Sequence, residues 1–172
     1  YVQSGVVKAW YFANGGNHVN PYPIVSTTNI ADNNWHHAAL VVDANGGRIY
    51  VDGLLASPIH TWVGTPSPPT TTENVRIVGY ASQYFPGEVD EVRIWNTART
   101  QCEIQTYMNA EITSTASGLV ANYHFNQGAA GLANSTVTTL TDASGNGKNG
   151  TLANFALTGT TSNWVSPGGV TS

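Results

Sequence analysis

Residues 35–43 read WHHAALVVD and residues 48–51 read RIYV, with the turn sequence NGG at 45–47 between the two runs. Both runs are rich in the β-branched, aromatic and apolar residues that favour strands. Asn and Gly tolerate the positive φ angles of a tight hairpin turn. A second turn, DG at 52–53, leads into the short apolar run LLA at 54–56. Three short strands joined by two tight turns predict an antiparallel meander.

Alternation of apolar and polar residues recurs on both sides of this meander. Thr100 and Glu103 form a capping-box pattern that predicts one helix of about two turns. Residues 58–72 hold four prolines, which cannot donate to a strand ladder, so a loop or a sheet edge is expected there. The other expected strands are 6–12, 75–80, 88–95 and 119–126, with one or two weak strands in 151–165. Many short strands with frequent turns predict an all-β sandwich.

The composition limits the partners of the chain. Only 9% of the residues are charged, the formal net charge is −4 and the pI is near 5.6. A chain with a net negative charge and few basic residues does not favour binding to the phosphates of a nucleic acid, so nucleic acid is excluded as a partner. No apolar run approaches the roughly 18 residues of a membrane span, so no membrane insertion is expected. Many hydroxyls and amides with few Lys, Cys and Met residues are common in exported bacterial proteins, so an extracellular or cell-surface location is expected.

Cys102 is the only cysteine. A single thiol excludes an internal disulfide and a zinc site built from cysteines. Its place in the predicted helix is typical of a small buried apolar side chain. We therefore expect Cys102 to be buried.

The segments WHHAALVVD at 35–43, GRIYVDG at 47–53 and GEVDEVRIWNTAR at 87–99 together resemble the laminin G-like jelly-roll family. That family belongs to the concanavalin A-like lectin/glucanase superfamily, and the resemblance covers about residues 1–110. It implies an all-β antiparallel jelly-roll β-sandwich with one short helix, in a multi-module exported bacterial protein. The family is a binding and structural platform with diverse partners, so the fold alone names no ligand.

Two departures from the family shape the expected domain organisation. The strands that normally open such a module are absent. Instead, GLVANYHFN at 118–126 and DASGNG at 142–147 resemble the segment that precedes the next module in tandem arrays. The expected parts are a jelly-roll portion at 1–110, a linker at 111–118, a strand segment at 119–165 that starts a further module or completes the same sandwich, and a linker at 166–172.

Absent opening strands would leave sheet edges unpaired, and such edges invite pairing with another strand. Residues 119–126 are one candidate to cover them. Strand sharing with another chain is the other candidate, and the number of missing strands favours it. We therefore expect self-association or strand sharing in solution.

Glu88, Asp90 and Glu91 invite comparison with enzymes. Some glucanases of this superfamily carry a Glu-x-Asp-x-x-Glu strand whose carboxylates serve as nucleophile and acid, roughly 5 Å apart. Glu88 and Asp90 share a face of the predicted strand, but the third position is Arg93 and Glu91 points to the other face. The sequence therefore predicts no catalysis. The acids are expected instead to pair with arginine or a metal.

Asp142, Asn146 and Asn149 lie in a glycine-rich turn. Closely spaced oxygens on a bent backbone suit Ca²⁺. The family resemblance favours a structural calcium site here, with Asp90 as a distant contributor. The alternative is a turn stabilised by Asx hydrogen bonds without an ion.

Trp62 lies beside His60 in the proline-rich segment, where no core pattern includes it, and Tyr80 and Tyr84 flank another loop. Exposed rings with amides and hydroxyls nearby are the usual platform for sugars, so these four are the predicted ligand-binding residues. The alternative is that Trp62 folds back over an open end of a sheet. The aromatic residues expected mainly in the core are Trp10, Tyr11, Trp35, Tyr50 and Trp95.

The favoured function is a non-catalytic carbohydrate-binding or adhesive module whose partners are glycans or neighbouring protein modules. One alternative is a structural repeat of an extracellular assembly with no small ligand. A second alternative is a glycoside hydrolase of the glucanase superfamily.

Overall fold

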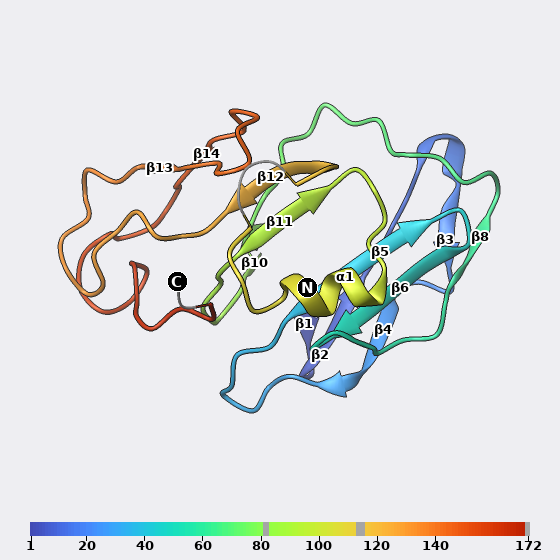
Figure 1. Cartoon of the computed structure of the whole chain (residues 1–172), viewed down its shortest axis with the longest axis horizontal. Helices are drawn as coiled ribbons and strands as arrows, with labels where there is room; N and C mark the ends of the chain where they lie inside the picture. The colour runs from blue at the N-terminus through green and yellow to red at the C-terminus, as the bar shows by residue number, and fades with distance from the viewer. Residues whose placement is uncertain (81–82, 113–115, 171–172) are drawn as a thin grey trace. The chain divides into compact units, whose positions relative to one another are not determined.

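The computed structural model describes residues 1–80, 83–112 and 116–170, apart from the side chains of Tyr80 and Gln83. Regular structure within these ranges consists of short antiparallel strands, a 3₁₀ turn η1 (Asn14–Gly16) and one α-helix (Figure 1). The predicted all-β jelly-roll fold is confirmed. In the described ranges, no helix is both long and apolar enough to cross a membrane.

The chain divides into two compact units. Unit 1 consists of Tyr1–Pro86 and Ala98–Met108. Unit 2 consists of Gly87–Thr97 and Asn109–Ser172. Each unit is therefore discontinuous in sequence, whereas the sequence predicted parts that follow one another along the chain.

The predicted meander forms one sheet of unit 1. β5 (Ala38–Asp43), β6 (Gly46–Val51) and β7 (Leu54–Leu55) pair antiparallel in that order. Asp52 and Gly53 both have positive φ, 50° and 73°. Positive φ at both central residues is the geometry of a type I′ turn, whose twist suits a two-residue hairpin. The second turn is where the sequence predicted it, whereas the first turn lies at residues 44–45, because Gly46 and Gly47 already pair with β5.

A second three-stranded sheet of unit 1 contains β1, β2 and β4, and β3 pairs separately with β8. The sequence did not predict β3 and β4, because Pro21 and Pro23 interrupt the alternation between them. The segment 58–72 was predicted to be a loop or a sheet edge, and it contains the short edge strand β8. The prolines flank this strand and do not interrupt it. The bounds are β1 (Val2–Gln3), β2 (Val6–Ala9), β3 (His18–Asn20), β4 (Ile24–Asn29) and β8 (Thr61–Val63).

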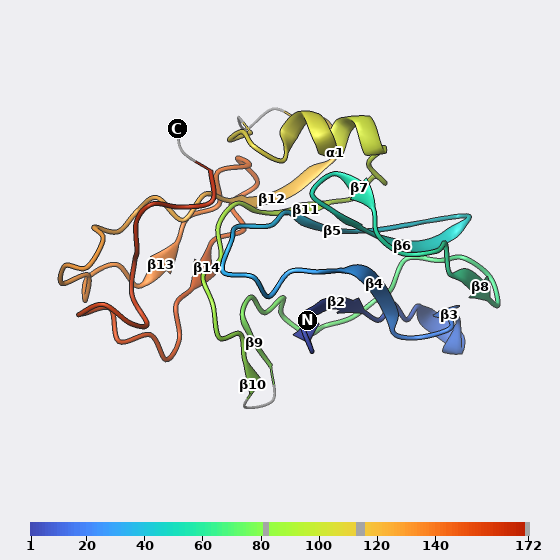
Figure 2. The same ribbon diagram turned by 90° about the horizontal axis from the view of Figure 1, so that it is seen from below.

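The two three-stranded sheets of unit 1 lie as two layers, seen from the side in Figure 2. The buried members of the core they share are Val19, Ile24, Ile49, Val51 and Ala56. Full burial of a side chain such as Ile24 or Ile49 contributes about 2 kcal/mol. A Cβ on Gly47 would lie 2.6 Å from Ile24 Cδ1. Glycine at this position therefore allows β6 to pack closely on the opposite layer.

The helix α1 (Gln101–Tyr107) is capped as the sequence predicted. The Thr100 hydroxyl accepts from the Glu103 N–H at 3.3 Å, and the Glu103 carboxylate accepts from the Thr100 N–H at 2.8 Å. Ile104 is buried in the second apolar cluster of unit 1. Cys102 is exposed, which corrects the prediction of a buried thiol. Residues two apart on a helix lie on nearly opposite sides, so Ile104 and Cys102 cannot both face the core.

Unit 2 is built around β11 and β12, which pair antiparallel. The chain beyond them forms another pair, β13 with β14. β11 is shorter than the predicted strand 88–95, because Glu91 has a φ of 49° and interrupts the extended backbone. The bounds are β11 (Val92–Trp95), β12 (Leu119–Tyr123), β13 (Thr139–Leu140) and β14 (Gly150–Thr151).

Candidate functional site

The residues around the prolines do not form the predicted exposed platform. Trp62 lies in β8, packs against the core of unit 1 and donates its Nε1–H to the Asp43 carbonyl at 2.8 Å. The Tyr11 ring meets it edge-on, with centroids 5.7 Å apart. His60 is buried, and its Nδ1 contacts the Pro21 carbonyl. Trp62 is therefore folded onto the sheets, which was the alternative interpretation of the sequence.

Tyr80 and Tyr84 belong to a short hairpin of β9 (Gly79–Tyr80) and β10 (Gln83–Tyr84). This hairpin replaces most of the strand predicted at 75–80. Tyr84 is 68% exposed, while the side chain of Tyr80 lies outside the described part of the structure. Ligand binding by Tyr80 and Tyr84 stays a prediction, as it does for Trp62 and His60.

Five other rings of unit 1 form two groups, Tyr1 with Trp10 and Phe12 with His18 and Tyr22, which are together called the aromatic row here. Ring centroids lie 5.4 Å apart for Tyr1 and Trp10, 5.5 Å for Phe12 and Tyr22, and 5.3 Å for His18 and Tyr22. Trp10, Phe12 and Tyr22 are each more than half exposed. The residue between Trp10 and Phe12 packs inward against the core, so these two rings share the outward side of the chain.

An open groove of about 480 Å³ adjoins the aromatic row. Tyr1 and Trp10 form part of its wall, together with Lys8. Small side chains such as Ala9 and Ala38 line other parts of it. Aromatic rings beside small side chains leave space for a ring-shaped ligand to lie against the protein.

The exposure of Trp10 and Trp35, 56% and 42%, corrects the expectation that they lie in the core. A signal for Trp10 was present in the sequence. Lys8 shares the alternation phase of Trp10 and Phe12, and a lysine is almost never fully buried. Because Lys8, Trp10 and Phe12 share one face of the strand, that face should point to solvent, and the opposite face, which carries Tyr11, should point to the core.

The Asp142 carboxylate organises its turn in unit 2. Its Oδ1 accepts from the N–H groups of Asn122 and Ser144, both at 2.9 Å. Its Oδ2 accepts from the Ser144 hydroxyl at 2.9 Å and the Lys148 N–H at 2.8 Å. Burial opposes ionisation, but these hydrogen bonds outweigh it and hold the pKa of Asp142 below its usual value. Four donors occupy all the acceptor sites of an ionised carboxylate, so the geometry favours the ion-free turn. Calcium binding stays a prediction.

The other predicted calcium ligands also have hydrogen-bond partners. Asn146 donates from Nδ2 to the Leu119 carbonyl at 2.9 Å, and Asn149 Oδ1 accepts from the Asp142 N–H at 2.9 Å. Asp90 accepts from the N–H groups of Glu91 and Val170, both at 3.0 Å. The turn thus brings the first three predicted ligands together, while Asp90 belongs to a different set of hydrogen bonds.

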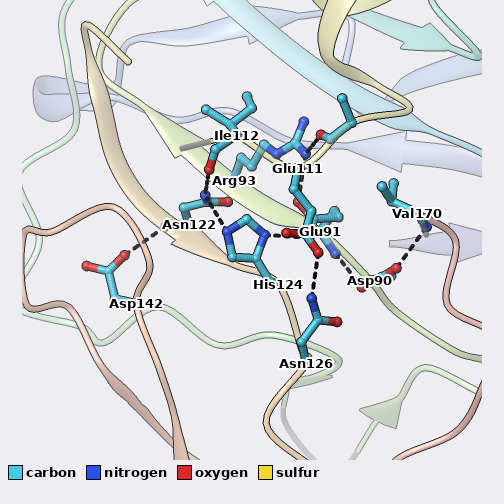
Figure 3. A network of polar contacts seen from close by, with 11 residues as sticks. Asp90, Glu91, Arg93, Glu111, Ile112, Asn122, His124, Asn126, Asp142 and Val170 are labelled. Atoms are coloured by element: carbon cyan, nitrogen blue, oxygen red, sulfur yellow. Dashed lines mark hydrogen bonds and ion pairs between the residues drawn. The ribbon is translucent and has the colours of Figure 1, made fainter. Parts of the chain in front are cut away.

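A second polar network of unit 2 surrounds His124 (Figure 3). Glu91 Oε1 lies 2.6 Å from His124 Nδ1, and Glu91 Oε2 lies 2.6 Å from Arg93 Nη2. The side chains of Glu91 and Arg93 are only 7% and 8% exposed. Glu111 is exposed and accepts from Asn126 Nδ2 at 2.6 Å. Glu91, Glu111 and His124 are here called the carboxylate–histidine cluster. Each offers one ligand atom, and these three atoms lie within 4.8 Å of one another.

Asn122 holds the imidazole of His124 from its other nitrogen. The Asn122 side chain is fully buried, and its Nδ2 donates to the Ile112 carbonyl at 2.9 Å and lies 3.3 Å from His124 Nε2. Nε2 is then the acceptor, so the ring proton sits on Nδ1 and faces Glu91. Asn122 Oδ1 is buried without a hydrogen-bond partner among the described residues.

The sequence does not mark the carboxylate–histidine cluster as a site. Glu91 was predicted to face away from Glu88 and Asp90 and to pair with arginine or a metal, and it does pair with Arg93; no pattern gave a role to His124 or Glu111. A partial signal existed, because His124 shares its alternation phase with Asn122 and Asn126. No pattern marks Glu111, which falls in the segment predicted as a linker.

Unit 1 contains a separate charged trio around His36. Its Nδ1 lies 2.8 Å from Asp52 and its Nε2 lies 2.9 Å from Asp32. Hydrogen bonds to Asp52 and then Asp32 raise the pKa of His36. The hydrogen bond from His36 is the main cause that lowers the pKa of Asp32 to about 2. Both ring nitrogens of His36 are hydrogen-bonded, so the trio links the loop that contains Asp32 to the turn that contains Asp52.

Residues 1–105 match a laminin G family described as the concanavalin A-like lectin/glucanases superfamily. Among solved structures, the chain is similar to a candidate carbohydrate-binding protein from Bacteroides ovatus. The TM-score is 0.53, with 21% identity over 86% of this chain, and at that identity the likeness shows the fold alone. The chain spans 45% of the length of that protein. No curated protein matches it.

Proposed function

The chain belongs to the concanavalin A-like lectin/glucanase superfamily, and from this premise we propose that it is a non-catalytic carbohydrate-binding module of an exported or cell-surface protein. The observation that carries the proposal is the aromatic row of unit 1 beside its groove. The similar protein from Bacteroides ovatus, described as a candidate for carbohydrate binding, supports it.

The aromatic row has the chemistry that a sugar ring requires. The axial C–H groups of a pyranose make one of its faces apolar, and that face packs on an exposed aromatic ring. Trp10 and Phe12 supply such rings on the same outward side of the chain. Lys8 and Tyr1 line the adjoining groove, and both residue types carry groups that can hydrogen-bond to sugar hydroxyls. The weak overall charge favours a neutral glycan as ligand.

A glycan array followed by titration calorimetry with the best-bound soluble glycan tests this proposal. Burial of one aromatic ring contributes about 1.5 kcal/mol or more, so Trp10→Ala and Phe12→Ala should each weaken binding at least about tenfold. Trp35→Ala removes an exposed tryptophan outside the row and should bind like the parent. An array without any bound glycan would overturn the proposal in favour of a structural repeat. Equal binding by all three variants would reject the aromatic row as the site.

The carboxylates of unit 2 do not favour the glycosidase alternative. Ligand atoms of Glu91 and Glu111 lie within 4.8 Å, close to the roughly 5 Å between the carboxyls of retaining glycosidases. Glu91, however, is nearly buried, with one oxygen paired to Arg93 and the other to His124. Neither oxygen is placed to attack a sugar.

Reducing-sugar release from soluble β-glucans tests the absence of catalysis. The parent, Glu88→Gln and Glu111→Gln should all stay at the level of buffer. Hydrolysis by the parent that either substitution abolishes would make the chain an enzyme.

A further inference from the structure

We propose that the carboxylate–histidine cluster of unit 2, formed by Glu91, Glu111 and His124, binds a divalent transition-metal ion of the Zn²⁺ class. An imidazole nitrogen with two carboxylate oxygens is a ligand set that suits such ions. Calcium, by contrast, prefers six to eight oxygens. The cluster is separate from the Asp142 turn, where the sequence predicted calcium, and from the aromatic row.

The three side chains converge from separate segments of unit 2, as Figure 3 shows. Glu91 precedes β11, His124 follows β12 and Glu111 lies between the two strands in sequence. Ligand atoms bound to a tetrahedral zinc at about 2.0 Å lie roughly 3.3 Å from one another. The atoms of the cluster are within 4.8 Å, so small side-chain shifts suffice. Glu111 is exposed, which leaves it free to move and lets water supply a fourth ligand.

The Asn122 amide contacts the second nitrogen of the His124 ring. When a metal binds His124 at Nδ1, the proton of that nitrogen is released to solvent and the ring keeps its proton on Nε2. A metal-bound histidine usually donates that second N–H to an acceptor. In the structure, the Asn122 atom that lies 3.3 Å from Nε2 is the donor Nδ2, so the amide would have to turn to present its buried Oδ1 to that N–H. That turn would exchange the hydrogen bond from Nδ2 to the Ile112 carbonyl for one from Nε2–H to Oδ1.

The local charges also suit a cation. Two carboxylates against one guanidinium leave a net negative charge around His124. Arg93 holds Glu91 through Oε2, so Glu91 Oε1 is the atom presented to Nδ1. A metal ion would replace the single proton that now lies between Oε1 and Nδ1.

Titration calorimetry of the chelator-stripped chain with zinc chloride tests the site. The parent should bind one equivalent of zinc, and Glu111→Gln and His124→Gln should each weaken binding at least about tenfold. Glu111 is exposed, so its substitution should not disturb folding. Glu88→Gln removes an exposed acid outside the cluster and should bind like the parent. No binding by the parent, or binding that the two cluster substitutions leave unchanged, would overturn the proposal.

Nitrogen-15 NMR of the His124 ring gives an independent readout. Without metal the ring proton should be on Nδ1, and one equivalent of zinc should move it to Nε2. A ring spectrum that zinc leaves unchanged would overturn the proposal. Displacement of the zinc by millimolar calcium would also overturn it, because the site would then prefer oxygen-ligated ions.

Discussion

The two compact units have different kinds of interior. Unit 1 buries apolar side chains between two sheets, with Ile24 and Ile49 fully inaccessible. Unit 2 also buries apolar side chains such as Leu119 and Leu140, but it adds the buried polar side chains of Asn122, Asn134, Asp142 and Ser144. Apolar packing has little directional preference, whereas each hydrogen bond fixes two atoms in one geometry. Hydrogen-bond partners should therefore contribute a larger share to the specification of unit 2 than to that of unit 1.

Asn134 shows how a polar side chain replaces a sheet in unit 2. Its Oδ1 accepts from the Ala129 N–H at 2.8 Å, and its Nδ2 donates to the Ala129 carbonyl and to Asn163 Oδ1, both at 2.8 Å. One amide thus satisfies backbone groups that no strand ladder satisfies. Cores tolerate swaps that conserve volume, while removing one partner of a buried hydrogen bond leaves the other unsatisfied. The two units should therefore respond differently to conservative substitutions.

Truncation after Ser117 should have the largest effect, because it removes β12 and most of the polar interior of unit 2. β11 would lose the strand it pairs with, and an unpaired strand edge invites aggregation. Light scattering should show large aggregates for the truncated chain. A monodisperse truncated chain would mean that unit 1 is stable without the polar unit. The same measurement on the intact chain tests the predicted self-association.

Ile49→Ala should destabilise unit 1 by about 3–5 kcal/mol, because it opens a cavity in a fully buried site. Ile49→Val is the matched control and should cost only about 1 kcal/mol. Denaturant unfolding measures the change in the free energy of unfolding for each variant. Hydrogen exchange followed by mass spectrometry shows which unit loses protection. Equal loss of protection in both units would contradict the comparison, since unit 1 alone should be affected.

Asp142→Ala should destabilise unit 2 by about 2–4 kcal/mol, because it leaves buried N–H groups without an acceptor. Asp142→Asn conserves volume but turns an NH₂ group toward N–H donors, so it should cost nearly as much. A harmless Asp142→Asn would show that shape, not hydrogen bonding, specifies the turn. Melting temperatures in chelator and in calcium should differ little. A large rise in calcium that Asp142→Ala removes would establish the predicted calcium site.

Acid should weaken unit 2 through Asp142. The folded state lowers the pKa of this carboxyl, so its contribution is present above the unfolded value of about 3.9 and is lost as the pH falls through the folded value. Hydrogen exchange should show loss of protection around the 142–149 turn below about pH 4. Asp142→Asn should remove this pH dependence. An unchanged dependence in that variant would assign the acid sensitivity to other groups.

Alkaline pH should weaken unit 1 slightly through His36, the smallest of the expected effects. The folded state raises the pKa of His36, so its contribution is present below the unfolded value of about 6.5 and is lost as the pH rises through the folded value. The melting temperature should fall between about pH 6 and pH 9, less so in high salt because Asp32 is exposed. His36→Gln should flatten this curve. A fall of the same size in the variant would contradict the role of His36.

The parts of the fold that the sequence predicted depend on local signals. The type I′ turn at Asp52-Gly53 and the capping box of Thr100 each involve residues within a few positions of one another. The favoured prediction exposed Trp62 and placed Trp10 in the core, because the packing of Trp62 depends on Asp43 and Tyr11, which are distant in sequence. The contact of Glu91 with His124 is of the same kind. Strand pairing creates it, and no spacing in the sequence marks it.

Because unit 2 comes from two separate stretches of the sequence, it limits how a gene for this chain can be cut and recombined. Residues 98–108, which separate β11 from β12 in sequence, belong to unit 1. A duplication of residues 109–172 alone would copy β12 without its pairing strand. The shortest segment that encodes both strands runs from 92 to 123 and carries helix α1 with it. Neither unit can be inherited whole as an uninterrupted piece of its own coding sequence.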